Sequence, residues 1–371
     1  MFLVRIRPKT LAAGGLPRLL AFVRVAENVR LAELTTLRLG GPARRLVAPD
    51  REQDVIDTVR DADGGGERLL VVGGGSNLVV GDEGIDGTVL HMVARGIALA
   101  TDDTDETVLV TVAAGEPWDE LVARMVAEGL AGMECLAGIP GSVGAVPMQN
   151  VGAYGQDVSE TIVSVRTWDR AAGRIAVFDR AACRFAYRSS VFRGSEAHVI
   201  LGVTFALTRR ATSAPLRYAE LTRALGIGAG ERAPLAATRE MVIALRRAKG
   251  MVLDAADPDT ASAGSFFTNP ILDAGALAAL RARVGDQLPV FPEADGRSKV
   301  SAAWLIERAG FAKGFALGRV AISTKHALAL TNRGGATTAE LMALARTIRD
   351  GVRERSGVVL ENEPVFVATA L

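Results

Sequence analysis

The strongest constraint on the fold of this chain is a long stretch of glycine and other small residues, GIPGSVGAVPMQNVGAYG at residues 138–155. The stretch contains two prolines and is too apolar to be a solvated linker. A buried irregular loop of this kind would need many internal hydrogen bonds for its backbone. The composition also suits a backbone surface that lies against a large flat ligand, because glycine lets other groups approach closely.

A second glycine cluster follows a predicted strand, in RLLVVGGGSNLVV at residues 68–80. Glycines let backbone N–H groups turn toward a phosphate, and Ser and Asn add further donors. The spacing matches neither the P-loop nor the dinucleotide fingerprint GxGxxG. A hairpin turn explains this cluster equally well by itself. Together with the first stretch, it indicates a dinucleotide with an extended pyrophosphate.

Length and composition set the class of protein. With 371 residues, the chain is long enough for two or three domains. A formal net charge of +1 gives no electrostatic footprint for nucleic acid or an anionic membrane. Two cysteines cannot form a disulfide framework and fit a reducing cytosol better. No apolar run approaches the ~20 residues of a spanning helix. We expect a cytoplasmic protein without nucleic-acid or membrane partners.

The pattern of apolar residues predicts an α+β fold. Most of residues 28–206 consists of short apolar runs divided by Gly and Asp. Strands are predicted at 68–72, 88–93, 107–115, 161–168 and 198–207, and helices near 51–62 and at 118–130. Farther along, helices are predicted at 238–250, 299–310 and 337–357, strands at 319–323, 326–332 and 357–369. In the first of these helices, Thr238 is a candidate N-cap.

Six motifs occur in an order that resembles the UDP-N-acetylenolpyruvoylglucosamine reductase family. They are LRLGGPA (37–43), VVGGGSN (71–77), LAGIPGSVGAVPMQNVGAYG (136–155), YRSSVF (187–192), AGSFFTNP (263–270) and LENEP (360–364). The resemblance implies a vanillyl-alcohol-oxidase/PCMH-type FAD-binding domain at 29–210 and a smaller α+β substrate-binding domain at 211–358. It also implies a C-terminal strand, 359–371, that returns to the N-terminal region. Residues 1–28 precede the resemblance, and their broken apolar stretches indicate a poorly ordered lead-in or an over-extended start.

The resemblance further implies an enzyme, UDP-N-acetylmuramate dehydrogenase, acting in peptidoglycan precursor synthesis. In that family NADPH reduces FAD, and the reduced flavin gives a hydride to the enolpyruvyl double bond of UDP-N-acetylglucosamine enolpyruvate. The carbon next to the carboxylate must then be protonated, and a well-placed alcohol can do this because the species is a strong base. Ser265 matches the family's proton donor, Arg188 its catalytic arginine, and Glu363 its catalytic glutamate.

The LENEP motif leaves one ambiguity, because related sequences more often have LEPE. Glu361 and Glu363 are one residue apart on a presumed strand and would share one face. Aligning both glutamates makes Glu363 the match. Residues matching the substrate-binding set of the family are Tyr218, Lys249 and Asn269, with Arg246 one helical turn before Lys249.

The glycine clusters supply the expected cofactor-binding set: Gly73, Gly74, Gly75, Ser76, Asn77, Gly141, Ser142, Gly144 and Gly152. The resemblance implies FAD with NADPH as co-substrate. Because His91 is the only histidine near the early loops, we expect the FAD to be bound non-covalently, and we expect a monomer. His91, His198 and His326 lack metal-ligand spacing, so no metal is expected. Two alternatives are an FAD oxidase of the same fold acting on a small alcohol or lactone, and a sugar-nucleotide-binding regulator that has lost its flavin.

Overall fold

The structure is a computed structural model that describes residues 23–101, 106–293 and 295–371. The expected lead-in therefore lies, up to residue 22, outside the described residues. The chain divides into two compact units, which are treated separately below. Unit 1 contains residues up to 29, 43–74 and 85–247, and unit 2 contains 30–42, 75–84 and 248–371.

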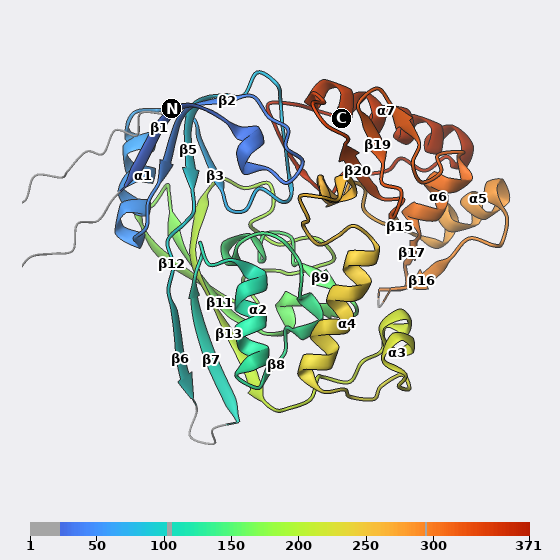
Figure 1. Cartoon of the computed structure of the whole chain (residues 1–371), viewed down its shortest axis with the longest axis horizontal. Coiled ribbons are helices and arrows are strands. Elements are labelled where there is room, and N and C mark those ends of the chain that lie inside the picture. The colour runs from blue at the N-terminus through green and yellow to red at the C-terminus, as the bar shows by residue number, and fades with distance from the viewer. Residues whose placement is uncertain (1–22, 102–105, 294) are drawn as a thin grey trace, which may run out of the picture. The chain divides into compact units, whose positions relative to one another are not determined.

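The two larger sheets of unit 1 contain most of its strands (Figure 1). The first has the order β1-β2-β5-β3, and β2, β5 and β3 are parallel. The second is antiparallel, with the order β12-β11-β13-β7-β6 and β8 beside β13. Their strands are β1 Arg24–Arg30, β2 Pro42–Ala48, β3 Leu69–Val72, β5 Ile85–His91, β6 Ile97–Thr101, β7 Thr107–Ala113, β8 Leu130–Ala131, β11 Ile162–Asp169, β12 Arg174–Asp179 and β13 His198–Arg209.

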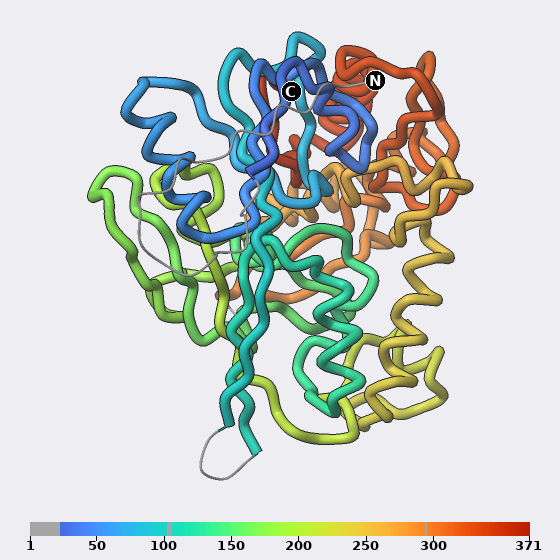
Figure 2. Tube along the Cα trace, turned by 60° about the vertical axis from the view of Figure 1, so that its left-hand side comes forward, coloured from blue at the N-terminus to red at the C-terminus, as the bar shows by residue number. Residues whose placement is uncertain are grey.

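Helices of unit 1 bury their apolar faces in one core. They are α1 Glu52–Gly64, α2 Trp118–Ala127, α3 Ala219–Leu225 and α4 Leu235–Ala248, and a small hairpin is formed by β9 Gly152–Ala153 and β10 Gln156–Asp157. Alternation along β7 sends Val108, Val110 and Val112 into this core. Trp118 of α2 packs there against Phe205 of β13, with ring centroids 6.0 Å apart. Figure 2 shows β6 and β7 running side by side as a long hairpin.

Unit 2 is built on three smaller sheets with the orders β14-β20-β19-β18, β15-β17-β16 and β21-β4. Its elements are β4 Leu78–Val80, β14 Ser262–Ser265, β15 Ile271–Leu272, α5 Ala274–Val284, β16 Val290–Pro292, β17 Ser298–Val300, α6 Ala302–Arg308, β18 Ala316–Leu317, β19 Val320–Ile322, β20 Ala329–Asn332, α7 Thr338–Ser356 and β21 Val365–Val367. Helix α7 packs on β19 and β20. The C-terminal strand β21 pairs in parallel with β4.

The α+β prediction is confirmed, and several local predictions need correction. Thr238 does not cap α4, because the helix begins at Leu235 and the Thr238 hydroxyl donates to the Pro234 carbonyl at 3.0 Å. The helix predicted at 299–310 is shorter, because residues 298–300 form β17 and Ser301 caps α6 instead. Only Val365–Val367 of the final predicted strand is a strand.

Candidate active site

In unit 1, the two glycine clusters touch each other. A Cβ atom on Gly73 would lie 2.1 Å from the Oγ of Ser142, and one on Gly74 would lie 2.8 Å from the Cα of Gly141. Gly141 itself has a φ of +125°, which favours glycine. The structure therefore brings together four residues that the sequence assigned to the cofactor.

Two other predicted cofactor-binding glycines also have no room for a side chain. A Cβ on Gly144 would lie 2.7 Å from the Cβ of Ala114, and one on Gly152 would lie 1.7 Å from the Oδ1 of Asp157. Both positions are thus filled by the protein itself. The sequence attributed these glycines to a ligand, whereas packing within unit 1 already requires them.

The second half of the GGGSN cluster belongs to unit 2. Gly75 has a φ of +58°, and a Cβ there would lie 1.7 Å from the Leu34 carbonyl oxygen. The Asn77 carbonyl accepts a hydrogen bond from the N–H of Val365 at 2.8 Å. Ser76 is partly buried in the same turn. Gly75 and Asn77 therefore join this turn to other segments of unit 2.

The contact between the two glycine clusters fits a pyrophosphate cofactor. Gly74 is exposed, and no side chain fits between it and Gly141. Backbone without side chains on an exposed surface is the arrangement by which N–H groups reach phosphate oxygens. Ser142, which is 6% exposed, occupies the space beside Gly73. Gly73, Gly74, Gly141 and Ser142 therefore lie together in unit 1, as a shared ligand surface would require.

Arg188 lies at the tip of a tight turn in unit 1. Ala186 and Ser189 exchange both backbone hydrogen bonds, at 3.0 and 3.1 Å, so Tyr187 and Arg188 form the two-residue tip. Arg188 has a φ of +51°, which non-glycine residues rarely adopt. Strained backbone of this kind clusters at functional sites. Arg193 supports the turn by donating to the Arg188 carbonyl.

The same turn is tied to the glycine-rich stretch. The Nη2 of Arg188 donates to the Gly152 carbonyl at 2.8 Å. Asn150 donates from Nδ2 to the Ala186 carbonyl at 3.2 Å, and the Ser190 hydroxyl donates to the Met148 carbonyl at 2.8 Å. The structure thus ties Arg188, a predicted catalytic residue, to Gly152, a predicted cofactor-binding residue.

Tyr154 is a contact residue that the sequence analysis did not nominate. Tyr154 and Gly155, with φ of +51° and +81°, form the turn between β9 and β10. The Tyr154 ring packs edge-on against Tyr218, with centroids 5.4 Å apart. Burial raises the pKa of Tyr154 to about 12, although Arg246 opposes the shift, so the phenol stays protonated at neutral pH. One signal was available, because Tyr154 is one of three tyrosines in the chain and precedes a glycine.

Burial is also the main influence on Arg246 in α4. It lowers the pKa of this guanidinium, while Tyr154 and Asp119 act in the opposite direction. Tyr218 stays 43% exposed at the start of α3. This part of unit 1 therefore combines an exposed aromatic ring with a cation and a protonated phenol, which suits a polar substrate bearing negative charge.

Ser265 lies at the end of β14 in unit 2. Its strand pairs with β20 with a register shift, since Ser262 faces Thr331 while Ser265 faces Ala329. Gly264, inside this irregularity, has a φ of +75°. Bulges of this kind re-aim a side chain. The next two residues, Phe266 and Phe267, are each 1% exposed and anchor the segment in the core.

The LENEP segment pairs directly with the residues after Ser265. Glu363 donates its N–H to the Phe266 carbonyl at 2.9 Å, and Thr268 donates its N–H to the Glu361 carbonyl at 3.0 Å. Glu361 is exposed, whereas Glu363 is partly buried. Of the two glutamates, Glu363 is therefore the one whose backbone N–H is hydrogen-bonded to Phe266, the residue that follows Ser265.

The remaining predicted substrate residues also lie in unit 2. Asn269 has a structural contact, because its Oδ1 accepts a hydrogen bond from Ala302 N at the start of α6, at 2.9 Å. Lys249 follows α4 and is partly buried. Nothing in the contact of Asn269 prevents its Nδ2 from donating elsewhere, since an amide has separate donor and acceptor groups.

Other candidate sites are less directly connected to these residues. Unit 1 holds a half-open cleft of about 670 Å³ between the start of α1 and the antiparallel sheet, where Arg51, Met92, Arg166 and Gly202 are among the lining residues. None of the predicted site residues lines it. Over the described ranges, no group of three or more His, Cys, Asp or Glu residues could hold a metal ion. No helix in those ranges is long and apolar enough to cross a membrane.

Comparisons with known proteins identify two matched regions of the chain and several relatives that match over most of its length. Residues 257–367 match a family described as UDP-N-acetylenolpyruvoylglucosamine reductase, C-terminal domain, and residues 43–179 match an FAD binding domain. The reductase of that name from Thermobifida fusca is 56% identical over 352 residues, covering 93% of this chain and 99% of the relative. That from Streptomyces coelicolor is 55% identical over 362 residues, covering 95% and 93%.

One solved structure adds a comparison of the fold. It is the crystal structure of the UDP-N-acetylenolpyruvylglucosamine reductase from Thermus caldophilus. This chain superposes on it with a TM-score of 0.64 at 25% identity, covering 93% of this chain and 100% of that one. The likeness therefore extends through both matched regions.

Proposed function

Because the chain belongs to the UDP-N-acetylenolpyruvoylglucosamine reductase family, we infer that it reduces UDP-N-acetylglucosamine enolpyruvate to UDP-N-acetylmuramate with NADPH. The enzyme is thus a flavin-dependent oxidoreductase of peptidoglycan precursor synthesis. We propose that the enzyme is a monomer and that it lies in the cytoplasm. The reducing environment of the cytoplasm suits both NADPH and the two thiols of the chain. In this proposal, residues 29–210 bind FAD, residues 211–358 bind substrate, and 359–371 form the returning C-terminal segment.

FAD, when bound, supplies the two-electron transfer between NADPH and the enolpyruvyl double bond. The residues proposed to hold it in unit 1 are Gly73, Gly74, Gly141 and Ser142, which form the exposed contact between the two loops. Gly144 and Gly152 support those loops through Ala114 and Asp157. In unit 2, the proposed donors are Gly75, Ser76 and Asn77. Because His91 is the only histidine near these loops in sequence, and its place is in β5, we propose non-covalent binding.

Arg188 is proposed to bind the substrate carboxylate. A guanidinium has a permanent charge and a planar fork, so it can pair with a carboxylate that gains enolate character. Its Nη2 already donates to Gly152, which limits the directions in which the remaining N–H groups point. The proposed role is therefore orientation of the carboxylate and stabilisation of the charge that develops on it.

Ser265 is proposed to donate the proton. The overall reaction adds one hydride to the terminal carbon and one proton to the carbon beside the carboxylate. The Ser265 hydroxyl gives up this proton and regains one from solvent, so the reaction consumes one proton per NADPH. The observation that carries this assignment is the backbone hydrogen bond from Glu363 to Phe266, which places Glu363 beside the residue that follows Ser265 in unit 2.

Glu363, which is partly buried, is proposed to act with Ser265 in protonating the substrate. Glu361, which is exposed, is not given this role. Lys249 and Asn269 are proposed to bind the diphosphate and the sugar part of the substrate, because an ammonium suits phosphate and an amide suits hydroxyl groups. Tyr218 is proposed to cover the substrate, which its exposure and its support by Tyr154 favour.

The test is spectroscopic and uses the purified full chain. We expect a yellow protein with an oxidised-flavin spectrum that NADPH bleaches anaerobically. Adding UDP-N-acetylglucosamine enolpyruvate should restore the colour and yield UDP-N-acetylmuramate. Recovery of colour only with oxygen and not with the enolpyruvyl substrate would indicate an oxidase, and a colourless protein that cannot be reconstituted would indicate a binding protein.

A further inference from the structure

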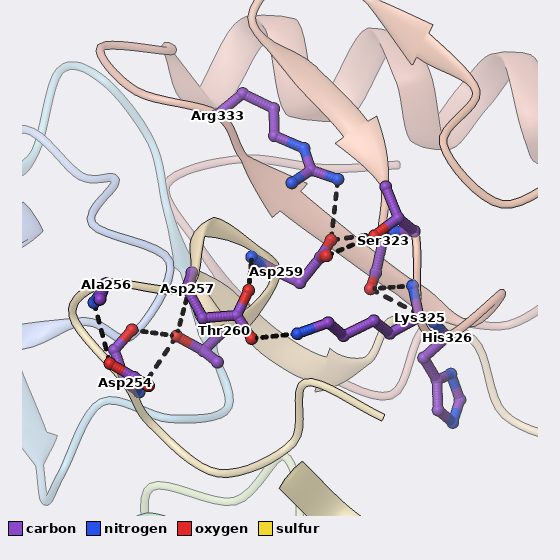
Figure 3. A network of polar contacts seen from close by, with 10 residues as sticks. Asp254, Ala256, Asp257, Asp259, Thr260, Ser323, Lys325, His326 and Arg333 are labelled. Carbon is purple, nitrogen blue, oxygen red and sulfur yellow. Dashed lines mark hydrogen bonds and ion pairs between the residues drawn. The ribbon is translucent and has the colours of Figure 1, made fainter. Parts of the chain in front are cut away.

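A buried carboxylate that the proposed reaction does not use lies six residues before Ser265. Asp259 is 4% exposed. It accepts hydrogen bonds from the backbone N–H of Thr324 at 2.9 Å, from the Thr324 hydroxyl at 2.5 Å, and from Nη2 of Arg333 at 2.8 Å. Figure 3 shows Arg333 directed at the Asp259 carboxylate, with Ser323 nearby. The Ser323 side chain also hydrogen-bonds this carboxylate. Asp259 therefore binds Thr324 and Arg333, which lie immediately before and after the segment that contains β20.

The charge of this carboxylate is supported by its surroundings. Burial alone would raise the pKa of Asp259, but the hydrogen bonds from Thr324 and Ser323 and the charge of Arg333 outweigh it and lower the pKa. Asp259 is therefore ionised at neutral pH, which makes its hydrogen bonds stronger than those of a neutral acceptor.

A second carboxylate binds the same segment. Asp257 accepts a hydrogen bond from Nζ of Lys325 at 2.6 Å, and its other oxygen accepts from the N–H of Asp259 at 3.0 Å. Inside the segment, the Ser323 hydroxyl accepts from the N–H groups of Lys325 and His326. Residues 323–328, which connect β19 to β20, are thus held by the loop 257–259 and by their own hydrogen bonds (Figure 3). We call residues 323–328 the β19–β20 turn.

The far end of the β19–β20 turn contacts the Ser265 strand. The N–H of Phe266 donates to the Leu328 carbonyl at 2.7 Å, and Ser265 faces Ala329 across the sheet. Leu328 is fixed in turn by His326, whose Nδ1 accepts the Leu328 N–H at 3.1 Å. The same turn therefore binds Asp259 at one end and sets the register after the bulge at the other.

We propose that Asp259 is a positioning residue for proton transfer, which holds the β19–β20 turn so that Ser265 is aimed correctly after its bulge. The inference rests on the proposed function, because Ser265 must be the proton donor. Asp259 does not itself exchange a proton with the substrate. Misplacing a reacting group by about 1 Å can cost roughly 100-fold in rate, so a positioning residue can have a large effect without touching substrate.

The test compares half-reactions in Asp259→Asn, which keeps the shape of the side chain and removes its charge. We expect reoxidation of the reduced flavin by the enolpyruvyl substrate to slow by about 10- to 100-fold. Flavin reduction by NADPH should change less than about twofold, the size of a small side-chain perturbation. The matched control is Asp254→Asn, whose side chain accepts a hydrogen bond from Ala256 in the same loop. It should match wild type in both half-reactions.

A double-mutant cycle separates positioning from general stability. In a Ser265→Ala background, Asp259→Asn should slow reoxidation little further, because there is no proton donor left to aim. Full additivity in the cycle, equal losses in both half-reactions, or an unchanged reoxidation rate in Asp259→Asn would each overturn the proposal. If wild type itself fails to reoxidise with the enolpyruvyl substrate, the proposed function fails instead.

A second pair of variants covers the case in which Asp259→Asn does not fold. Thr324→Val removes the hydroxyl that donates to Asp259 and keeps the shape of the side chain. Thr324→Ser retains the hydroxyl. In the valine variant we expect flavin reoxidation by the enolpyruvyl substrate to slow while flavin reduction by NADPH is unchanged. In the serine variant we expect reoxidation at nearly the wild-type rate. Equal rates in the two variants would contradict the role of the Asp259 contact.

Discussion

Gly74 and Gly141 approach so closely that a Cβ atom on Gly74 would lie 2.8 Å from the Cα of Gly141. Gly74 is exposed, but the position of its missing Cβ atom is occupied by Gly141, so the two backbones approach each other directly. In Gly74→Val we expect the two loops to be forced apart and FAD to be bound poorly or not at all. The ratio of flavin to protein absorbance measures this effect. A fully flavinated and active Gly74→Val enzyme would contradict the assignment of these loops.

Two other glycine variants serve as controls. Gly144→Val should lose flavin through loss of folding stability, because its side chain would collide with Ala114, and its melting temperature should fall sharply. Gly64 ends α1 with no atom within 4 Å of a built Cβ. Gly64→Ala should therefore retain flavin and gain about 0.5–1 kcal/mol in stability.

Arg188 combines a left-handed backbone with a hydrogen bond to Gly152. Arg188→Lys keeps the positive charge and removes the planar fork, so substrate-driven flavin reoxidation should slow by about 100-fold or more, the scale of one lost charge-stabilising donor. Flavin reduction by NADPH should be nearly unchanged. Arg184→Lys is the matched control, because Arg184 is exposed in the same segment and also has a positive φ, +47°. Equal rates in the two lysine variants would remove Arg188 from the mechanism.

Lys249 is proposed to bind the substrate diphosphate. Lys249→Ala should weaken binding of the enolpyruvyl substrate by about 1.5–3 kcal/mol, the scale of a charged hydrogen bond. The Michaelis constant for that substrate should then rise roughly 10- to 150-fold, while flavin reduction by NADPH changes less. Lys313→Ala, at an exposed position, is the control. An unchanged Michaelis constant in Lys249→Ala would show that the phosphates bind elsewhere.

The sequence predicted what depends on local pattern. The short apolar runs at 107–115 and 198–207 identified β7 and β13, and the apolar period of 337–357 identified the long helix α7. The sequence-based prediction was wrong where pairing with a distant segment of the chain determines the secondary structure. Residues 298–300 form a strand because they pair with β15 and β16, although the predicted helix begins at residue 299.

The same limit applies to the candidate site. Motif order indicated Arg188, Gly152, Ser265 and Glu363, but not the hydrogen bonds that tie Arg188 to Gly152 and Glu363 to Phe266. Glycines also looked alike in sequence. A Cβ atom at Gly74, Gly144 or Gly152 would in each case collide with another part of the chain, and only exposure separates Gly74, which is exposed, from the other two, which are partly buried.

Stability at low pH should depend on Glu340 in the capping box of α7. Hydrogen bonds from Arg319 and from the N–H of Thr337 lower the pKa of Glu340 to about 2. Because the folded-state pKa lies below the unfolded value of about 4.3, the stabilisation is complete above that value and is lost as pH falls toward 2. The difference in melting temperature between wild type and Glu340→Gln should therefore shrink below pH ~4. Glu354→Gln, exposed on the same helix, should show no such trend.

The proposed role of Ser265 makes the most specific prediction. Ser265→Ala should fold, bind FAD and be bleached by NADPH at nearly the wild-type rate. Protonation of the substrate carbon should slow by at least about 10²- to 10⁴-fold, the usual contribution of a positioned general acid, which corresponds to ~3–5 kcal/mol of barrier. Stopped-flow measurement of flavin reoxidation by the enolpyruvyl substrate checks this value.

Ser265→Cys distinguishes the loss of a proton from the loss of packing. A thiol can still donate a proton and is close in size to the hydroxyl, so the cysteine variant should retain more activity than the alanine variant. If Ser265 is only a residue of the irregular β14 edge, alanine would cost a little stability and leave both half-reactions intact. A normal reoxidation rate in Ser265→Ala would therefore exclude it as the proton donor, whatever the fate of the flavin-binding loops.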